Sequence, residues 1–417
     1  MDLQIMKKYI FALSFMATLL PAQTLTMQEC IDKTLQTHPN IKSFALEISK
    51  SEQGYISARS ALLPHLDLQA EYDPQRTYVM PKNGELSTLN QSNLQVGISL
   101  QQKVFDFYKT SSLIDSAKVD EEIAKLSSQE AKNLMIYKVE TLYETALIQK
   151  ETIEVHKKDL QTKEELYKQA NAFVEQGLKT TSDSTRFLSA LYAAQDALSK
   201  AEAEFQKTVT TLSLYTSQNI SFDTEFLKDI SMDKSQTVDL TLQNNTELQI
   251  YDKAIEKNKF QTQAFKAQHY GSLDLIAGYN HFDNINAYDT HFVGLTLNIP
   301  LFTGFDTSAK EQMSAISTSI AREAKSSKNL LLQEEFGKLL IDKKRYAKTI
   351  EAKQAQLEAS LSTKNLLQAR YKEGLATYIE LLDVTTLYLT SALELLEAKY
   401  NLSLIQYKII YLTGAKQ

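Results

Sequence analysis

Cysteine, tryptophan, glycine and proline are all scarce in this chain of 417 residues. Cys30 is the single cysteine, so neither an internal disulfide nor a thiolate metal cluster can form within one chain. The 11 glycines are never closer than seven residues apart, so neither a dinucleotide-binding fingerprint nor a phosphate-binding loop can be assembled. The net charge of −6 provides no basic surface, which argues against nucleic acid as a partner.

The histidines do not indicate a metal site or a catalytic site either. None of the six forms a pair at metal-binding helical spacing. His281 and His291 flank a hairpin loop and could approach each other, but a pair of polar loop residues explains them better than a metal site. No nucleophile has a recognisable base. We therefore expect no enzyme: no catalytic residue, no metal site and no cofactor.

The first residues are typical of an export signal. Lys7 and Lys8 precede an apolar run over residues 9–20, and Pro21 and Ala22 offer a cleavage site. A run of about 12 apolar residues is too short to cross a bilayer as a helix, which needs roughly 20. Residues 1–22 are predicted to be a signal peptide, and the alternative is an uncleaved amphipathic or core helix.

The remaining chain contains an internal repeat. Residues 96–100 and 176–178 match residues 293–297 and 373–375 at an offset of 197, and upstream the offset becomes 207. We predict a first repeat over 23–216, an equatorial linker over 217–240 and a second repeat over 241–417. The first copy has ten additional residues between Tyr72 and Val96, and its prolines and glycine predict a longer loop there.

Each copy contains a short region of strict apolar and polar alternation, which predicts two hairpins and four strands with one apolar face. Half-buried hairpins on a soluble core are the simplest explanation. Export favours a membrane sheet instead, as do aromatic residues near the strand ends, which are typical of the girdles of membrane barrels. Those aromatic residues are Tyr72, Tyr78, Tyr279, Phe282, Tyr288, Phe292, Phe302 and Phe305. The residues expected to face lipid are Leu68, Val96, Leu275 and Leu295.

Four strands are too few to close a membrane barrel, because the smallest have about eight. An open edge in lipid would leave backbone polar groups unpaired. If these strands cross a bilayer, several chains must therefore share one barrel.

Nearly everything else is helical. Uninterrupted patterns run from about 107 to 173 and from 306 to 372, which predicts helices on the order of 100 Å long. In the first, apolar residues recur every seven positions as in a coiled coil. That seam consists of Val139, Ala146, Ile153, Leu160, Tyr167 and Val174. In the second, Lys343 and Lys364 interrupt the register and are expected to point to solvent or to a wide lumen.

Gly177 and Gly374 follow the two long helices, and a shorter helical pattern then returns the chain. These glycines indicate ordinary helix C-caps, the exposed tips of helical hairpins, or both.

Two tandem copies of helix, strand hairpin, very long helix, glycine turn and return helix resemble the TolC family of outer-membrane ducts. The resemblance covers essentially the whole mature chain. Its sharpest local match is residues 371–383, which read Tyr-Lys-Glu-Gly-Leu-Ala-Thr-Tyr-Ile-Glu-Leu-Leu-Asp. Residues 25–29 with His38 and Pro39 are also similar to the start of family members.

The resemblance implies a mainly α fold with a small β part. Three protomers would share a 12-stranded β-barrel, continued by a long periplasmic α-helical barrel. Glu380 and Asp383 would occupy the acidic rings that narrow the closed end of the pore. Their three-residue spacing places both carboxylates on one helical face. Without the resemblance, they would be taken for solvated acids on a helix surface.

The resemblance also implies contacts at the tips. Tyr371 and Asp183 match a polar pair that gates the pore, while Ala376 stands where the family has an arginine and Lys179 is a substitute for it. The adaptor-contacting motif matches Gly177, Leu178, Gly374 and Leu375.

The resulting hypothesis is a passive exit duct in the outer membrane that extends into the periplasm. The implied partners are two further copies of the chain, a periplasmic adaptor (membrane fusion) protein, an inner-membrane RND or ABC transporter, and outer-membrane lipid. The duct would serve a tripartite efflux pump or a type I secretion system, and its cargo stays open. The alternative is a soluble periplasmic coiled-coil scaffold, in which the chain's own helices must cover the apolar strand faces.

Overall fold

A computed structural model describes residues 26–79, 84, 87–218, 242–283 and 287–414. The predicted signal peptide and residues 219–240 of the predicted linker lie outside this part of the chain. The chain forms two compact units. The first comprises residues 1–38, 134–238 and 337–411, and the second comprises 39–133, 239–336 and 412–417. Each unit contains segments of both predicted repeats, so the two copies pack against each other within both units.

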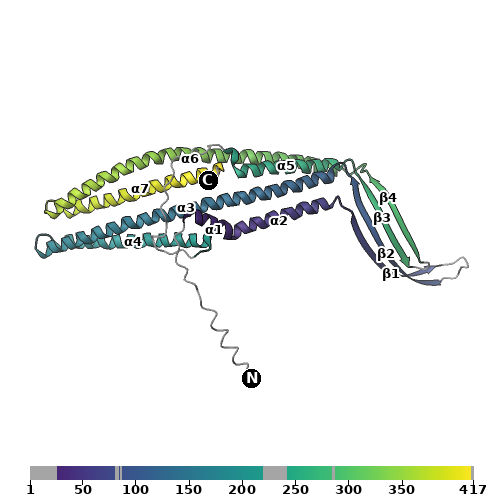
Figure 1. The fold of residues 1–417 in the computed structure, drawn as a ribbon, viewed down its shortest axis with the longest axis horizontal. Coiled ribbons are helices and arrows are strands. Elements are labelled where there is room, and N and C mark those ends of the chain that lie inside the picture. The colour runs from purple at the N-terminus through teal and green to yellow at the C-terminus, as the bar shows by residue number, and fades with distance from the viewer. Residues whose placement is uncertain (1–25, 80–83, 85–86, 219–241, 284–286, 415–417) are drawn as a thin grey trace, which may run out of the picture. The chain divides into compact units, whose positions relative to one another are not determined.

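The second unit carries the sheet. Strands β1 (His65–Val79), β2 (Ser87–Phe105), β3 (Ser272–Asp283) and β4 (Tyr288–Asn298) lie side by side in that order, all antiparallel (Figure 1). The β2–β3 pair joins the two predicted copies, with a register shift between Lys103 and Phe105. The two predicted hairpins are therefore confirmed, and they share one sheet.

The first hairpin corrects one expectation. Most of the ten additional residues extend the strands, because β1 continues through Pro74 to Val79 and β2 begins at Ser87. The prediction that this interval is a longer loop is wrong for these residues. Pro74 fits an edge strand because it has no N–H to donate, and among the described residues β1 pairs only with β2.

Helix α5 (Thr246–Ala267) connects two longer helices of the same unit through ion pairs. Asn245 caps its first turn by accepting a hydrogen bond from the backbone N–H of Leu248 at 3.0 Å. Lys257 reaches Asp120 at 2.7 Å, and Lys325 reaches Asp252 at 2.6 Å. Because these pairs are partly exposed, they fix orientation more than they add stability. The 3₁₀ turn η2 (Leu242–Asn244) precedes α5, and α2 (Pro39–Ser60) occupies the equivalent place in the first copy.

The long helices follow the repeat offset. Helices α3 (Lys109–Glu175) and α6 (Asp306–Lys372) each have 67 residues, and α4 (Thr181–Thr216) and α7 (Tyr378–Thr413) each have 36. Helix α3 begins two residues later than predicted, because Phe107 and Tyr108 have φ of 53° and 69°. Those angles cannot belong to a right-handed helix.

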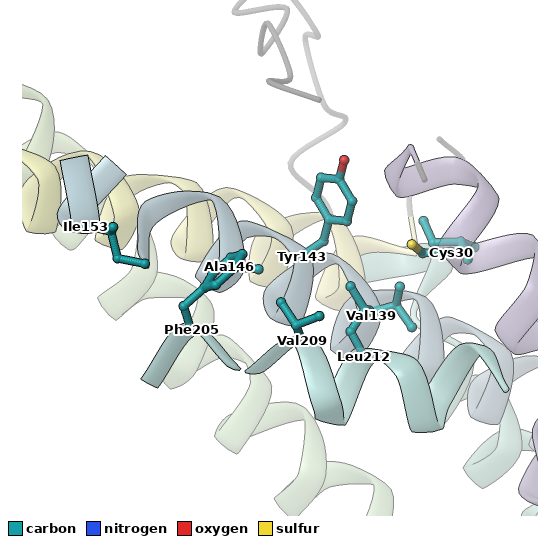
Figure 2. Close-up of a cluster of buried hydrophobic side chains, with 9 residues drawn as sticks. Cys30, Val139, Tyr143, Ala146, Ile153, Phe205, Val209 and Leu212 are labelled. Carbon is teal, nitrogen blue, oxygen red and sulfur yellow. The ribbon is translucent and has the colours of Figure 1, made fainter. Parts of the chain in front are cut away.

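A buried apolar cluster holds α1 (Met27–Thr37), α3 and α4 together in the first unit (Figure 2). Val139, Ala146 and Ile153 from the predicted heptad seam are at most 1% exposed and meet Phe205 and Leu212 of α4. The last three seam positions are half-buried. The seam therefore forms a helix–helix core over its first half.

The two lysines that interrupt the second register behave differently. Lys343 is exposed, as expected. Lys364 is half-buried, and its Nζ lies 4.5 Å from the centroid of the Tyr388 ring on α7. The expectation that Lys364 points to solvent or a lumen is therefore wrong, since its ammonium packs on an aromatic face within the unit.

Candidate duct surfaces and helical tips

The register of the sheet places all four predicted lipid-facing residues on one side. Leu68 pairs with Ile98, and Leu275 pairs with Leu295. Alternate residues of a strand share a face, so the pairing extends across all four strands. We call this side the apolar face. It contains Leu66, Leu68, Ala70, Tyr72, Leu94, Val96, Ile98, Leu100, Leu273, Leu275, Ala277, Tyr279, Val293, Leu295 and Leu297.

No helix in the described part of the chain covers much of the apolar face. Leu68 is 73% exposed, Leu295 65% and Val293 80%, while Val96 and Leu275 are half-exposed beside their neighbours. A continuous uncovered patch of large apolar side chains marks a surface that another apolar phase or partner must cover. The soluble-scaffold alternative required the chain's own helices to cover this face, and the helices of the described ranges do not.

Polar side chains interrupt the apolar face near the second hairpin loop, where the register places His281, Asp289 and His291. His281 Nδ1 lies 2.7 Å from Asp289 Oδ1 on the neighbouring strand. Register pairs His291 with Tyr279, so His281 is partnered by an aspartate and not by the second histidine. Within the described ranges, no group of three or more histidine, cysteine, aspartate or glutamate residues is arranged to hold a metal ion.

The aromatic residues near the strand ends divide between the two faces. Tyr72 and Tyr279 lie on the apolar face, but Phe282, Tyr288 and Phe292 lie on the opposite face with Asn280 and Thr290. The expected girdle of aromatic residues near the strand ends is therefore not confined to the apolar face, because the alternation of the strands turns these three residues to the opposite one. The side chain of Tyr78 lies outside the described part.

Phe292 is held on this opposite face by a glycine. A Cβ at Gly278 would lie 2.7 Å from two ring carbons of Phe292, which is closer than van der Waals contact allows. Two register pairs further along the same face, Phe282 and Tyr288 stack with ring centroids 4.8 Å apart. The opposite face is therefore polar along most of its length and aromatic near one end.

Both helical tips are built around a glycine in the left-handed region. Gly177 has a φ of 73°, its N–H donates to the Val174 carbonyl at 2.9 Å, and the Leu178 N–H donates to Phe173 at 2.9 Å. This pair of bonds closes a helix C-terminus and favours glycine. Leu178 is left 64% exposed.

The second tip repeats this geometry at the offset of 197. Gly374 has a φ of 72°, its N–H donates to the Tyr371 carbonyl at 3.0 Å, and the Leu375 N–H donates to Arg370 at 2.8 Å. Leu375 is 68% exposed. The predicted adaptor-contacting residues are therefore two C-cap glycines, each followed by an exposed leucine.

The return helices start with matching caps. The Thr377 N–H and hydroxyl donate to Glu380 Oε2 at 2.7 and 2.8 Å, and the Glu380 N–H donates to Thr377 Oγ1 at 3.3 Å. At the first tip, the Thr180 N–H donates to Asp183 Oδ2 at 3.3 Å. Glu380 and Asp183 are thus equivalent capping residues. The pattern of threonine followed by an acid three residues later could have revealed this role in the sequence.

Glu380 and Asp383 are both exposed near the start of α7. Hydrogen bonds from the backbone and side chain of Thr377 lower the pKa of Glu380, and Arg370 contributes to the same shift. Glu380 therefore carries its negative charge more readily than a free glutamate.

The structure brings the predicted tip pair together inside a core. Tyr371 is fully buried, with its ring centroid 5.8 Å from that of Phe187 and 6.0 Å from that of Phe173. Burial raises the pKa of Tyr371, and the nearby Asp183 raises it further. Among the described residues, the Tyr371 hydroxyl has no hydrogen-bond partner.

Lys179 also reaches this cluster. Its Nζ lies 5.8 Å from the centroid of the Tyr371 ring, within the range of a cation–π contact. Ala376, which stands where the arginine is expected, is buried at 5% exposure. Asp183, Tyr371 and Lys179 therefore form one group, and Glu380 with Asp383 form a separate exposed one.

A sheet with an uncovered apolar face, combined with long paired helices and closed helical tips, defines an outer-membrane duct protein. The chain belongs to the outer membrane efflux protein family, whose model matches residues 30–218 and 237–415. It is 23% identical over 412 residues to the outer membrane protein TolC of Vibrio cholerae serotype O1, covering 92% of this chain and 88% of that protein.

Solved structures share the fold. The outer membrane protein VceC of Vibrio cholerae superposes with a TM-score of 0.81 at 16% identity, over 93% of this chain and 96% of VceC. The CmeC outer membrane channel of Campylobacter jejuni gives a TM-score of 0.81 at 14% identity, over 93% and 85%. The family and the neighbours are channel proteins, and the chain is an outer-membrane efflux protein. None of the helices in the described ranges is both long and apolar enough to span a bilayer.

Proposed function

We propose that this chain is the exit duct of a tripartite efflux pump or a type I secretion system, passively conducting cargo from the periplasm to the exterior. The observation that carries the proposal is the apolar face, which the described helices leave uncovered. The protomer would comprise residues 23–216 and 241–417 as two repeats joined by 217–240, after removal of 1–22.

Assembly follows from the sheet edges. Among the described residues, β1 pairs only with β2 and β4 only with β3, so both outer edges are open. Open edges are not tolerated in lipid, and four strands cannot close on themselves. We infer that β4 of one copy pairs with β1 of the next in a homotrimer, which gives a closed barrel of 12 strands.

The apolar face supplies the first experiment. Leu295→Arg places a charge on this face and should cost about 2 to 4 kcal/mol at the bilayer midplane. Thr296→Arg is the matched control, because it lies one residue away on the opposite face. The fraction of heat-resistant trimer in outer-membrane fractions should fall for Leu295→Arg alone. Equal recovery of both variants would contradict a lipid-facing role.

The exposed acids supply the gate. Glu380 and Asp383, repeated three times, would place six carboxylates around the closed end of the pore. Their mutual repulsion would be relieved by bound cations or by iris-like opening. Asp183 and Tyr371 would hold the two helical hairpins of one protomer together while the tip is closed, and Lys179 would supply the missing cation.

Single-channel recording tests the acidic ring. Because Glu380 also caps α7, Asp383→Asn is the cleaner variant, and it should weaken block by a multivalent cation. Thr377→Ala is the control, since it perturbs the same cap without removing a charge. Unchanged block in Asp383→Asn would remove this residue from the pore.

The exposed tips supply the adaptor surface. Gly177 and Gly374 turn the chain so that Leu178 and Leu375 project, and these leucines would contact a periplasmic adaptor protein. Leu178→Cys and Leu375→Cys should form cross-links to a co-expressed adaptor with a cysteine-reactive linker. Cys30 will not compete, because burial raises the pKa of its thiol to about 12. Absence of cross-links at both tips would place the adaptor elsewhere.

Energy and selectivity would come from an inner-membrane RND or ABC transporter, and the duct needs no cofactor. Drug, metal-ion and protein cargo are all compatible with such a conduit. Identifying the transporter that co-purifies with the trimer decides among them.

A further inference from the structure

A cavity of about 360 Å³ lies among α3, α6 and α7, within the unit that carries the tips. One part of its wall is apolar and includes Val155, Leu357, Ala392 and Leu395. Ligand-binding cavities start at roughly 300 Å³, so this one is large enough for a small molecule.

The rest of the wall carries an excess of positive charge. Lys158, Lys364 and Lys399 line it together with a single carboxylate, Asp159. Asp159 also interacts with Lys163, a buried lysine that does not line the cavity: Lys163 Nζ lies 3.9 Å from Asp159 Oδ1. The same ammonium donates a hydrogen bond to Thr385 at 2.9 Å. The carboxylate therefore balances charge outside the cavity as well as within it.

None of the three lining lysines makes an ion pair within the described part of the chain. Lys364 packs its ammonium on the Tyr388 ring at 4.5 Å, and its burial lowers its pKa. Lys158 and Lys399 are exposed at the rim, so Lys364 is the half-buried ammonium of the three. Asp159 and Glu165 offset part of the cost of burying it, and a bound anion would offset more.

We propose that this cavity binds an amphipathic anion. A carboxylate or phosphate would lie among Lys158, Lys364 and Lys399, with an alkyl body against Val155, Leu357 and Leu395. The excess charge selects the head group and the apolar wall selects the body. The proposal goes beyond the duct function, because it requires neither a pump nor an open pore.

Fatty acids of increasing length are suitable probes, and hexanoate, octanoate and decanoate should be tested as monomers on the full-length protein in nanodiscs. Lysine reactivity toward reductive methylation, measured by mass spectrometry, reports occupancy at each side chain. Lys158, Lys364 and Lys399 should be protected saturably, whereas the exposed Lys343 on α6 should not. Each added methylene should tighten binding about fourfold until the cavity is filled.

Two further ligands separate the parts of the proposal. Decanol has the body without the charge, and inorganic phosphate has the charge without the body. Both should protect the three lysines far less than decanoate does. Equal protection by either one would overturn the amphipathic assignment. Protection that tracks only the amount of fatty acid taken up by empty nanodiscs would do so too.

Variants locate the site. Lys364→Gln and Lys399→Gln should each weaken decanoate binding about tenfold, as expected for loss of a charge-assisted hydrogen bond. Protection from methylation is measured at Lys399 in the first variant and at Lys364 in the second. Lys343→Gln is the matched control and should bind normally. Retention of the trimer on gels checks folding. Unaltered binding in both cavity variants, or no saturable protection in the parent, would refute the proposal.

Discussion

The two helical tips have the same backbone and different side chains. Each long helix ends at a glycine with a φ near 70°, closed by the same two hydrogen bonds, and each return helix starts with a threonine and an acid three residues later. The turn is dictated by backbone hydrogen bonding, which constrains only the glycine and the cap.

Equivalent side chains at the two tips differ in burial and charge. At the first tip Asp183 is buried at 9% exposure, whereas its equivalent Glu380 is exposed. Position 371 is a buried tyrosine where the first copy has the half-buried Val174, and position 383 is an aspartate where the first copy has Arg186. The first tip thus contributes charge to the contact between hairpins, and the second presents its acids outward. Duplication conserved the turn and left the side chains to specialise.

The largest expected difference between the tips is at Tyr371. Tyr371→Ala removes a buried ring from contact with Phe173 and Phe187 and should cost about 3 to 5 kcal/mol, as for other large aromatic truncations. Val174→Ala, the equivalent change at the first tip, should cost much less because Val174 is half-buried. Hydrogen exchange over the last turns of α3 and α6 gives both opening free energies. Equal losses would mean that the tips are not specialised.

The sequence predicted the shared part of the tips and missed the specialised part. The helical pattern and the offset of 197 placed α3 and α6 within two residues, because periodicity and glycine are local signals. The burial of Asp183 and Tyr371 depends on contacts between helices almost 200 residues apart, which no local pattern contains. The cap at Glu380 did have a local signal, which is the threonine three residues before the acid.

The sheet shows the same limit. Alternation fixed the apolar face, including Leu68 and Leu295, since one residue of slip would reverse it. Prolines at 74 and 81 suggested a loop, yet an edge strand accommodates Pro74. Whether a strand lies at an edge is a property of the whole sheet, so the sequence of one hairpin did not contain the answer.

The glycine turns should respond equally at the two tips. Gly177→Ala and Gly374→Ala each force a side chain into the left-handed region and should cost about 1 to 2 kcal/mol. Gly337→Ala is a control for which the expected change in stability has the opposite sign. Gly337 lies inside α6 with nothing near its missing Cβ, so alanine should stabilise the helix by about 0.5 to 1 kcal/mol. Thermal unfolding of all three variants checks the prediction, and a large difference between the two tips would contradict a shared backbone motif.

The caps should differ slightly. Thr377→Ala removes the two bonds of the Thr377 hydroxyl to Glu380, at 2.8 and 3.3 Å, and should destabilise the start of α7 by about 1 kcal/mol. Thr180→Ala should cost less, because the bond between the Thr180 N–H and Asp183 is long at 3.3 Å and survives the substitution. Hydrogen exchange in the first turns of α4 and α7 measures both. A larger loss at the first tip would reverse the comparison.

The smallest effect separates the two roles of Glu380. Its pKa is lowered from the usual 4.5 by the Thr377 hydrogen bonds, so the stabilisation is present above pH 4.5 and is lost as the pH falls through the lower folded value. In Glu380→Gln the opening free energy at the start of α7 should therefore fall at neutral pH and match the parent in acid. Asp383 takes no part in the cap, so Asp383→Asn should leave this pH profile unchanged. Both variants should nevertheless weaken block by a multivalent cation. If Asp383→Asn reproduced the acid-dependent change, the charge of the pair would stabilise the helix, and the cap would not be its cause.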